Sequence, residues 1–139
     1  MDEAHMVGLG KYLDIHGYQN RYDILRRHME RVNKIAKAHG FEPMMWSDMF
    51  FRFATGGGYW TDDIVITEKE KSRVPEGMNV IYWDYYSLNK ERYDAMFDNH
   101  KLLSDKVWFA GGIWTWTGFT PHNRESLRVV NPSIESCIE

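Results

Sequence analysis

The sequence predicts an α/β fold in which parallel strands alternate with helices, and three observations lead to this prediction. Two segments carry apolar residues at steps of three and four, the spacing of an amphipathic helix. Short apolar runs, too short to be helices, lie next to these segments. Strands and helices that alternate along a chain join into right-handed parallel units.

The first helix is expected after Gly17. Asn20 can accept hydrogen bonds at its start, and Gly40 ends it. The basic residues between Arg21 and Lys37 are expected to face solvent. The apolar stripe of this helix comprises Tyr18, Tyr22, Leu25, Met29, Val32, Ile35 and Ala36.

The run from Phe41 to Asp48 predicts a short buried strand, because it is apolar, too short for a helix and ends in polar residues. A long irregular connection is expected from Phe50 to Gly77. Loops of this length inside a compact domain are usually functional.

A second strand is predicted over residues 79–84, followed by a helix that Ser87 or Asn89 can cap. The apolar stripe of this helix comprises Tyr93, Met96, Phe97, His100 and Leu103. The histidines on or beside the predicted helices are expected at a surface or an edge; they are His28, His39 and His100.

A third strand is predicted over residues 106–112, with Trp108 in the core, and an aromatic loop follows over residues 113–119. A last helix is expected from about Asn131, because Pro132 suits the first turn of a helix.

Polar or aromatic residues follow each predicted strand, and long loops come next. Active sites of (β/α)₈ barrels lie at this end of the strands. A full TIM barrel takes about 250 residues, so this chain of 139 residues corresponds to a partial one, roughly the C-terminal half. We expect one partial barrel domain over residues 1–139, whose unpaired strand edges favour self-association.

Composition excludes several classes of partner. The formal net charge of −3 argues against nucleic acid, because neutralising phosphates needs a basic surface. No apolar run approaches the roughly 20 residues that cross a bilayer, so no membrane partner is expected. Cys137 is the single cysteine, and no zinc-ligand spacing occurs, so we expect no metal and no cofactor. The compartment stays open, with the cytoplasm slightly favoured because neither a disulfide nor a signal peptide is visible.

Aromatic residues make up 15% of the chain, and several of them stand at predicted strand ends beside aspartates. Indole rings stack on the apolar faces of sugars, and carboxylates accept hydrogen bonds from sugar hydroxyls, which predicts a carbohydrate site. The residues in this pattern are Trp46, Asp48, Trp83, Asp84, Trp114 and Trp116.

Asp2 and Glu3 are adjacent carboxylates. Because neighbouring carboxylates repel, one tends to keep its proton while the other stays ionised. Glycoside cleavage uses this division, with a protonated acid for the leaving oxygen and a charged partner for the cationic transition state.

Four stretches together resemble glycoside hydrolase family 20, the β-N-acetylhexosaminidases, and favour its single-barrel bacterial enzymes. They are MDEAHMVGLGKYLD (1–14), MWSDM (45–49), VIYWDYY (80–86) and GGIWTWTGF (111–119). These stretches are similar to the ends of the fourth to seventh barrel strands, in the family's order. The resemblance therefore covers nearly the whole chain, from the end of strand four to helix seven.

This resemblance implies retaining hydrolysis of a terminal β-linked N-acetylglucosamine or N-acetylgalactosamine by a substrate-assisted mechanism. The substrate's acetamido oxygen would attack the anomeric carbon, giving an oxazolinium intermediate. Glu3 would protonate the glycosidic oxygen and later activate water, while Asp2 would hold the acetamido N–H. Tyr82, Tyr85 or Tyr86 would bind the acetamido carbonyl oxygen. The implied substrate-binding residues are Trp46, Asp48, Trp83, Asp84, Tyr85, Trp114 and Trp116.

The expected partner is thus a small carbohydrate. Because the family's early strands and its eighth strand have no counterpart here, we expect this stretch alone to be inactive. The alternative hypotheses are a sugar-binding module without catalysis and an inactive half-barrel.

Overall fold

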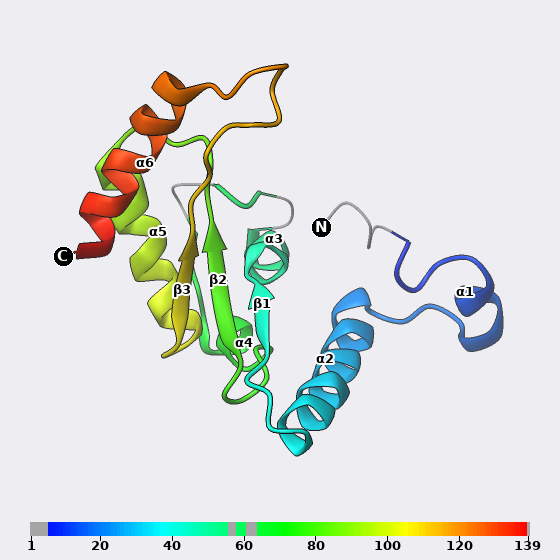
Figure 1. Ribbon diagram of the computed structural model, residues 1–139. Coiled ribbons are helices and arrows are strands. Elements are labelled where there is room, and N and C mark those ends of the chain that lie inside the picture. The colour runs from blue at the N-terminus through cyan, green and yellow to red at the C-terminus, as the bar shows by residue number, and fades with distance from the viewer. Residues whose placement is uncertain (1–5, 56–57, 61–63, 139) are drawn as a thin grey trace.

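Three parallel strands form the sheet of this computed structural model, which describes residues 6–55, 58–60 and 64–138. The strands are β1 (Met44–Trp46), β2 (Asn79–Trp83) and β3 (Val107–Ala110), and β2 lies between the other two. All three run in the same direction, so their carboxyl ends meet at one edge of the sheet (Figure 1). The predicted alternation of parallel strands with helices is therefore confirmed.

The helices accompany the strands in the expected order. They are α1 (Lys11–His16), α2 (Arg21–Ala38), α3 (Asp48–Thr55), α4 (Glu68–Lys71), α5 (Lys90–Leu103) and α6 (Asn123–Ile138). Helix α5 packs on β2 and α6 packs on α5, whereas α1 and α2 stand apart on the side of β1 (Figure 1). None of the helices in these ranges is long and apolar enough to cross a membrane.

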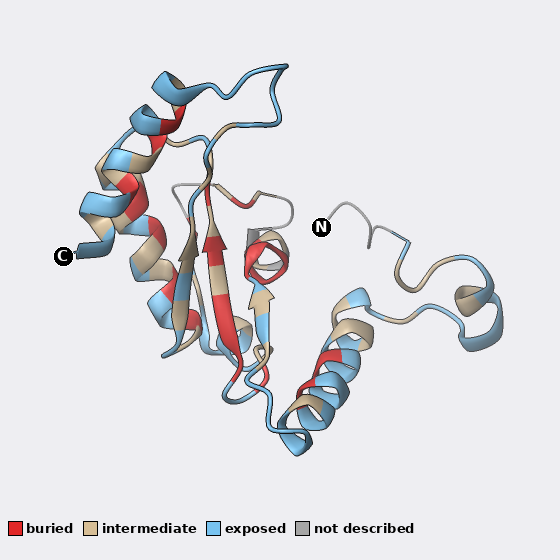
Figure 2. Ribbon diagram, in the orientation of Figure 1, coloured by how far each residue is buried: buried red, intermediate tan, exposed pale blue. Residues whose placement is uncertain are grey.

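The face of the sheet that α5 covers holds the core. The register pairs Tyr82 with Phe109, which places both rings on this face. Each ring contacts Phe97 of α5, with centroids 5.2 and 5.4 Å apart. Tyr82 and Tyr93 are fully buried, and Figure 2 shows buried residues along β2 and on α5. These aromatic contacts explain why the predicted stripe of α5 faces the sheet.

The opposite face of the sheet is largely open. Met44, Trp46 and Trp108 lie on it and are 47%, 48% and 57% exposed. The strand expected between Phe41 and Asp48 is present as β1, but the prediction that it is buried is wrong, and so is the core position expected for Trp108. An apolar side chain in a strand is buried only where a second layer covers its face, and the covering layer here lies on the other side.

Helix α2 confirms the first predicted helix and both of its ends. The Asn20 side chain accepts a hydrogen bond from the Tyr22 N–H at 2.9 Å, which caps the start. At the other end Gly40 has φ 75°, and the Phe41 N–H donates to the Ala36 carbonyl, as in a Schellman motif. The helix is only partly covered, because Met29 is buried while the rest of its stripe is half-buried or exposed.

The connection from Phe50 to Gly77 contains two helices rather than being irregular throughout. Helix α3 begins directly after β1, where the Ser47 carbonyl accepts from the Phe50 N–H at 2.9 Å. Its Met49, Phe50 and Phe51 side chains are buried, with Phe51 at 0% exposure. Helix α4 begins with a capping box formed by Thr67 and Glu70, a pattern that the sequence already contains.

Helix α6 begins at Asn123 and not near Asn131, so Pro132 lies inside it. Proline removes the N–H that would bond to the carbonyl four residues earlier, which normally disfavours an interior position. Here packing on α5 outweighs that cost, because Val129 is 1% exposed and its carbonyl accepts from the Tyr93 hydroxyl at 3.3 Å.

Replacing Asn20 with alanine tests the cap of α2. The substitution removes the acceptor for the Tyr22 N–H and should lower the free energy of unfolding by about 1 kcal/mol. Urea unfolding followed by circular dichroism measures this change. Asn131→Ala is the control, because Asn131 is exposed inside α6 and alanine favours a helix interior. An equal loss in both variants would contradict the assigned cap.

Candidate functional site: an aromatic surface at the strand ends

Aromatic side chains gather at the carboxyl edge of the sheet. We call this group the aromatic surface, and its members come from the ends of β2 and β3 and from the loop after α3. They are Trp60, Trp83, Tyr85, Tyr86, Trp114 and Trp116. The structure thus brings together four of the residues predicted for sugar binding, namely Trp83, Tyr85, Trp114 and Trp116.

The rings form a continuous series of contacts. Trp83 contacts Tyr85 with centroids 5.4 Å apart, and Tyr85 contacts Trp116 at 5.6 Å. Trp114 and Trp116 stack at 5.5 Å with an interplanar angle of 26°. At the other end of the series the Trp60 ring contacts the Trp83 ring, with centroids 4.8 Å apart. Since Trp116 is 51% exposed, the series presents ring area to solvent.

Trp114 holds the loop after β3 against the turn after β2. Its indole N–H donates to the Tyr85 carbonyl at 2.8 Å. Its backbone N–H donates to the Ser126 hydroxyl at 2.9 Å, and its carbonyl accepts from the His122 N–H at 2.8 Å. The loop is therefore tied both to the turn after β2 and to the first turn of α6.

Gly112 permits the close approach of these rings. A Cβ atom at this position would lie 2.7 Å from Cδ1 of Tyr85 and 2.9 Å from Cη2 of Trp116. Both distances are shorter than real Cβ contacts. The glycine is therefore required by the packing of the aromatic surface.

Asp84 organises the turn that carries Tyr85 and Tyr86. Its buried carboxylate accepts from the Tyr82 hydroxyl at 3.1 Å and from the Tyr86 N–H at 2.8 Å. It also accepts from the Ser87 N–H at 3.0 Å and the Ser87 hydroxyl at 2.5 Å. Burial and the Asp84 carboxylate raise the pKa of Tyr82, which keeps this hydroxyl a proton donor. Asp84 thus holds the backbone beneath the aromatic surface.

The other predicted residues lie apart from this group. Asp48 is 2% exposed at the start of α3, with its carboxylate 3.6 Å from Nε of Arg52. Trp46 lies on the open face of the sheet, where it is 48% exposed. Asp2 and Glu3 lie outside the described residues.

The sequence reasoning missed Trp60 and its neighbour Tyr59, which fell in the connection expected to be irregular. Tyr59 is 3% exposed and stacks on Trp83 with centroids 5.2 Å apart and an interplanar angle of 27°. Two adjacent aromatics after a run of glycines were the available signal. The ring that both of them contact, Trp83, is however far away in the sequence.

A hollow of about 540 Å³ adjoins the aromatic surface at the start of α5. Its lining residues are Trp60, Asp84, Tyr86, Ser87, Leu88, Asn89 and Arg92. A volume of this size can hold a monosaccharide-sized ligand. In the described part of the chain, no cluster of histidine, cysteine and carboxylate side chains could hold a metal ion.

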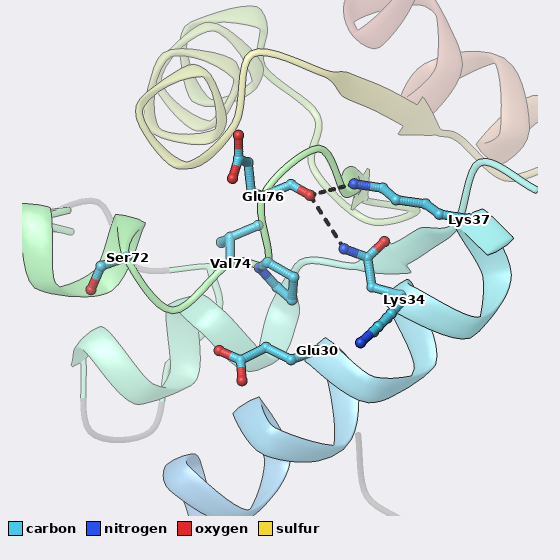
Figure 3. A pocket seen from close by; sticks show the side chains of 8 residues that line it. Glu30, Lys34, Lys37, Ser72, Val74 and Glu76 are labelled. Atoms are coloured by element: carbon cyan, nitrogen blue, oxygen red, sulfur yellow. Dashed lines mark hydrogen bonds between the residues drawn. The ribbon is translucent and has the colours of Figure 1, made fainter.

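A second hollow, of about 620 Å³, lies between α2 and the segment before β2 (Figure 3). There the Lys37 ammonium and the Asn33 amide both donate to the Glu76 carbonyl, at 2.7 and 3.2 Å. These bonds tie α2 to the rest of the fold. The hollow adjoins the amino ends of the strands, so it is separate from the aromatic surface.

Replacing Gly112 with alanine should displace the rings of Tyr85 and Trp116, because the new methyl group would overlap both. We expect a changed near-ultraviolet circular dichroism spectrum, which reports the packing of aromatic side chains. Gly118→Ala is the matched control, since a Cβ atom there meets nothing within 4 Å. Identical spectra for Gly112→Ala and the unsubstituted protein would contradict the described packing.

Comparison with known proteins assigns no family to the chain. No family model matches it, and no curated protein matches it in sequence.

Proposed function

We propose that this chain is part of the catalytic barrel of a retaining β-N-acetylhexosaminidase of glycoside hydrolase family 20. The substrate is a terminal, non-reducing β-linked N-acetylglucosamine or N-acetylgalactosamine. The observation that carries the proposal is the aromatic surface at the carboxyl edge of the parallel sheet. This edge is where barrel enzymes bind their substrates.

The aromatic surface suits an amino sugar. The stacked pair of Trp114 and Trp116 offers flat apolar area to the C–H face of a pyranose ring. The hydroxyls of Tyr85 and Tyr86 supply polar contacts beside it. Burial, and then the neighbouring Tyr86, raises the pKa of Tyr85, so its hydroxyl remains a donor.

The open face of the sheet supports the proposed barrel. In a closed (β/α)₈ barrel the strands present one face to the helices and the other to a filled interior. Here α5 covers one face, whereas Met44, Trp46 and Trp108 stay exposed on the other. Those side chains would fill the interior once further strands closed the ring.

The proposed chemistry follows the resemblance. The acetamido oxygen of the substrate attacks the anomeric carbon, the glycosidic bond breaks, and Glu3 gives its proton to the leaving oxygen. Asp2 accepts from the acetamido N–H and stabilises the positive charge of the oxazolinium ring. Water then attacks the anomeric carbon and loses its proton to Glu3, while the bond from that carbon to the oxazolinium oxygen breaks and restores the acetamido group. This second displacement returns the anomeric carbon to its original configuration.

The structure favours two of the three tyrosines proposed for the acetamido carbonyl. Tyr82 is fully buried and donates to Asp84. Tyr85 and Tyr86 belong to the aromatic surface, and Tyr86 is 50% exposed. We therefore place this role on Tyr85 or Tyr86.

A sugar-binding module without catalysis is the second candidate. The observation in its favour is that the rings of the aromatic surface, from Trp60 to Trp116, contact one another directly. Binding and turnover are therefore measured separately.

Binding is tested on the chain itself by titration with N-acetylglucosamine, followed by ligand-observed NMR. We expect saturable binding that Trp116→Ala weakens about tenfold, equivalent to about 1.4 kcal/mol. Trp108→Ala is the control, because Trp108 is equally exposed but lies outside the aromatic surface. Equal weakening by both substitutions, or no binding at all, would contradict a sugar site at this surface.

Catalysis is tested on a longer form that supplies the remaining strands, with 4-nitrophenyl N-acetyl-β-glucosaminide as substrate. Glu3→Gln should lower kcat by roughly 10²–10⁴, because glutamine cannot donate the proton. Asp2→Asn should lower it as well. Full turnover by Glu3→Gln would reject the role of Glu3, whereas sugar binding without turnover in the unsubstituted form would favour the second candidate.

A further inference from the structure

A buried chain of hydrogen bonds runs beneath the aromatic surface, from Trp83 to helix α5. The Trp83 N–H lies 3.2 Å from the Tyr59 hydroxyl, which is 2.9 Å from the Ser47 hydroxyl. Ser47 is in turn 2.6 Å from Nε2 of His100, and Nδ1 of His100 is 2.5 Å from the Met96 carbonyl. The chain thus joins β2, the loop after α3, the end of β1 and α5.

The Met96 carbonyl at one end and the Trp83 N–H at the other determine which group donates in each hydrogen bond. The Met96 carbonyl can only accept, so Nδ1 of His100 carries a hydrogen, and Nε2 of the neutral ring accepts. Ser47 therefore donates to His100, and the Tyr59 hydroxyl donates to Ser47. The Tyr59 oxygen accepts from the Trp83 N–H. Each hydroxyl in the chain both donates and accepts once.

This series of hydrogen bonds is shielded from solvent, since Ser47 and His100 are 0% exposed and Tyr59 is 3% exposed. A buried polar group that loses its partner costs more than the bond was worth, because no water replaces it. A change at His100 must therefore be passed along to Ser47 and Tyr59 rather than absorbed by solvent.

Tyr59 connects the chain to the aromatic surface in two ways. Its hydroxyl binds the backbone N–H of Trp83, and its ring stacks on the Trp83 indole at 5.2 Å. Trp83 also contacts both Trp60 and Tyr85, so it stands in the middle of the surface. A displacement of Tyr59 would therefore reach the rings proposed to bind sugar.

We propose that Ser47, Tyr59 and His100 are positioning residues that hold the Trp83 indole in its binding orientation, and that a proton on His100 releases it. The sugar-binding part of this inference rests on the proposed function. The positioning of Trp83 does not, because it concerns the protein without ligand.

Protonation of His100 would leave one hydroxyl hydrogen in these bonds without an acceptor, because Nε2 would become a donor to Ser47. If the Ser47 oxygen accepts from both His100 and Tyr59, the Ser47 hydrogen is unpaired. If Ser47 instead donates to the Tyr59 oxygen, the Tyr59 hydrogen is unpaired. Every donor and acceptor in this series of hydrogen bonds has a partner only while His100 is neutral.

The surroundings of His100 favour its neutral form. The titratable side chains that pack on its ring are Tyr59 and Tyr82, and Phe51 of α3 covers another side. The carboxylates of Asp48 and Asp84 act electrostatically on Tyr59. Burial lowers the pKa of His100 from 6.5 to about 4. Neutral His100 therefore contributes fully to the free energy of unfolding above pH 6.5. This contribution is lost as the pH falls from 6.5 towards 4.

The first test uses the ligand-free chain and Tyr59→Phe, which keeps the stacked ring and removes the hydroxyl. Without its acceptor, the Trp83 amide should exchange with solvent about fivefold faster, measured by NMR. Tyr18→Phe is the matched control, since Tyr18 is 84% exposed. Exchange of Trp83 at the unsubstituted rate in Tyr59→Phe would overturn the positioning role, whatever the protein binds.

The second test is the pH dependence of N-acetylglucosamine binding. The unsubstituted chain should lose affinity as the pH falls from 6.5 to 4. His100→Gln should hold its affinity through this range, because the glutamine amide can accept from Ser47 and donate to Met96 without titrating. Equal pH profiles for both proteins would overturn the role of His100. If Trp83 responds to Tyr59→Phe but no sugar binds at any pH, the proposed function fails while the positioning of Trp83 stands.

Discussion

The parallel pairing of β1, β2 and β3 is the constraint on which the rest of this structure depends. It brings three strand ends to one edge, although the residues that follow them are separated by about thirty positions in the sequence. Rings that no local spacing could bring together, such as those of Trp60, Trp83 and Trp116, meet there as a result. The loops after the strands then refine the arrangement, through the indole bond of Trp114 and the close approach allowed at Gly112.

The two faces of the sheet have different consequences for function. The face beneath α5 is filled by rings, and the buried chain from His100 to Trp83 continues this packing to the edge where the aromatic surface begins. The other face leaves Met44, Trp46 and Trp108 exposed. Burying apolar area stabilises a sheet in proportion to the area covered, so the open face favours further strands or a second copy. The proposed barrel would cover this face, whereas the predicted self-association depends on the unpaired edges of the strands.

Asp84 shows how a residue can support a site without facing its ligand. The Trp-Asp pattern at the end of β2 predicts a carboxylate that accepts from sugar hydroxyls. In the structure this carboxylate accepts from Tyr82, Tyr86 and Ser87 and is fully buried. It holds the turn that presents Tyr85 and Tyr86, so its contribution to the proposed sugar site is the shape of the backbone beneath the rings.

The sequence by itself determined those features that depend on near neighbours. The two caps of α2, the apolar stripe of α5 and the order of strands and helices follow from side-chain periodicity and from local hydrogen bonding around Asn20 and Gly40, whereas the start of α5 at Asn89 has no side-chain cap bond. Tertiary structure alone decided that Trp108 is exposed, that His100 is buried, that Pro132 lies within a helix and that Trp60 joins the aromatic surface. Each of these outcomes depends on which surface a distant segment covers, and burial is a property of two layers in contact rather than of one stretch of chain.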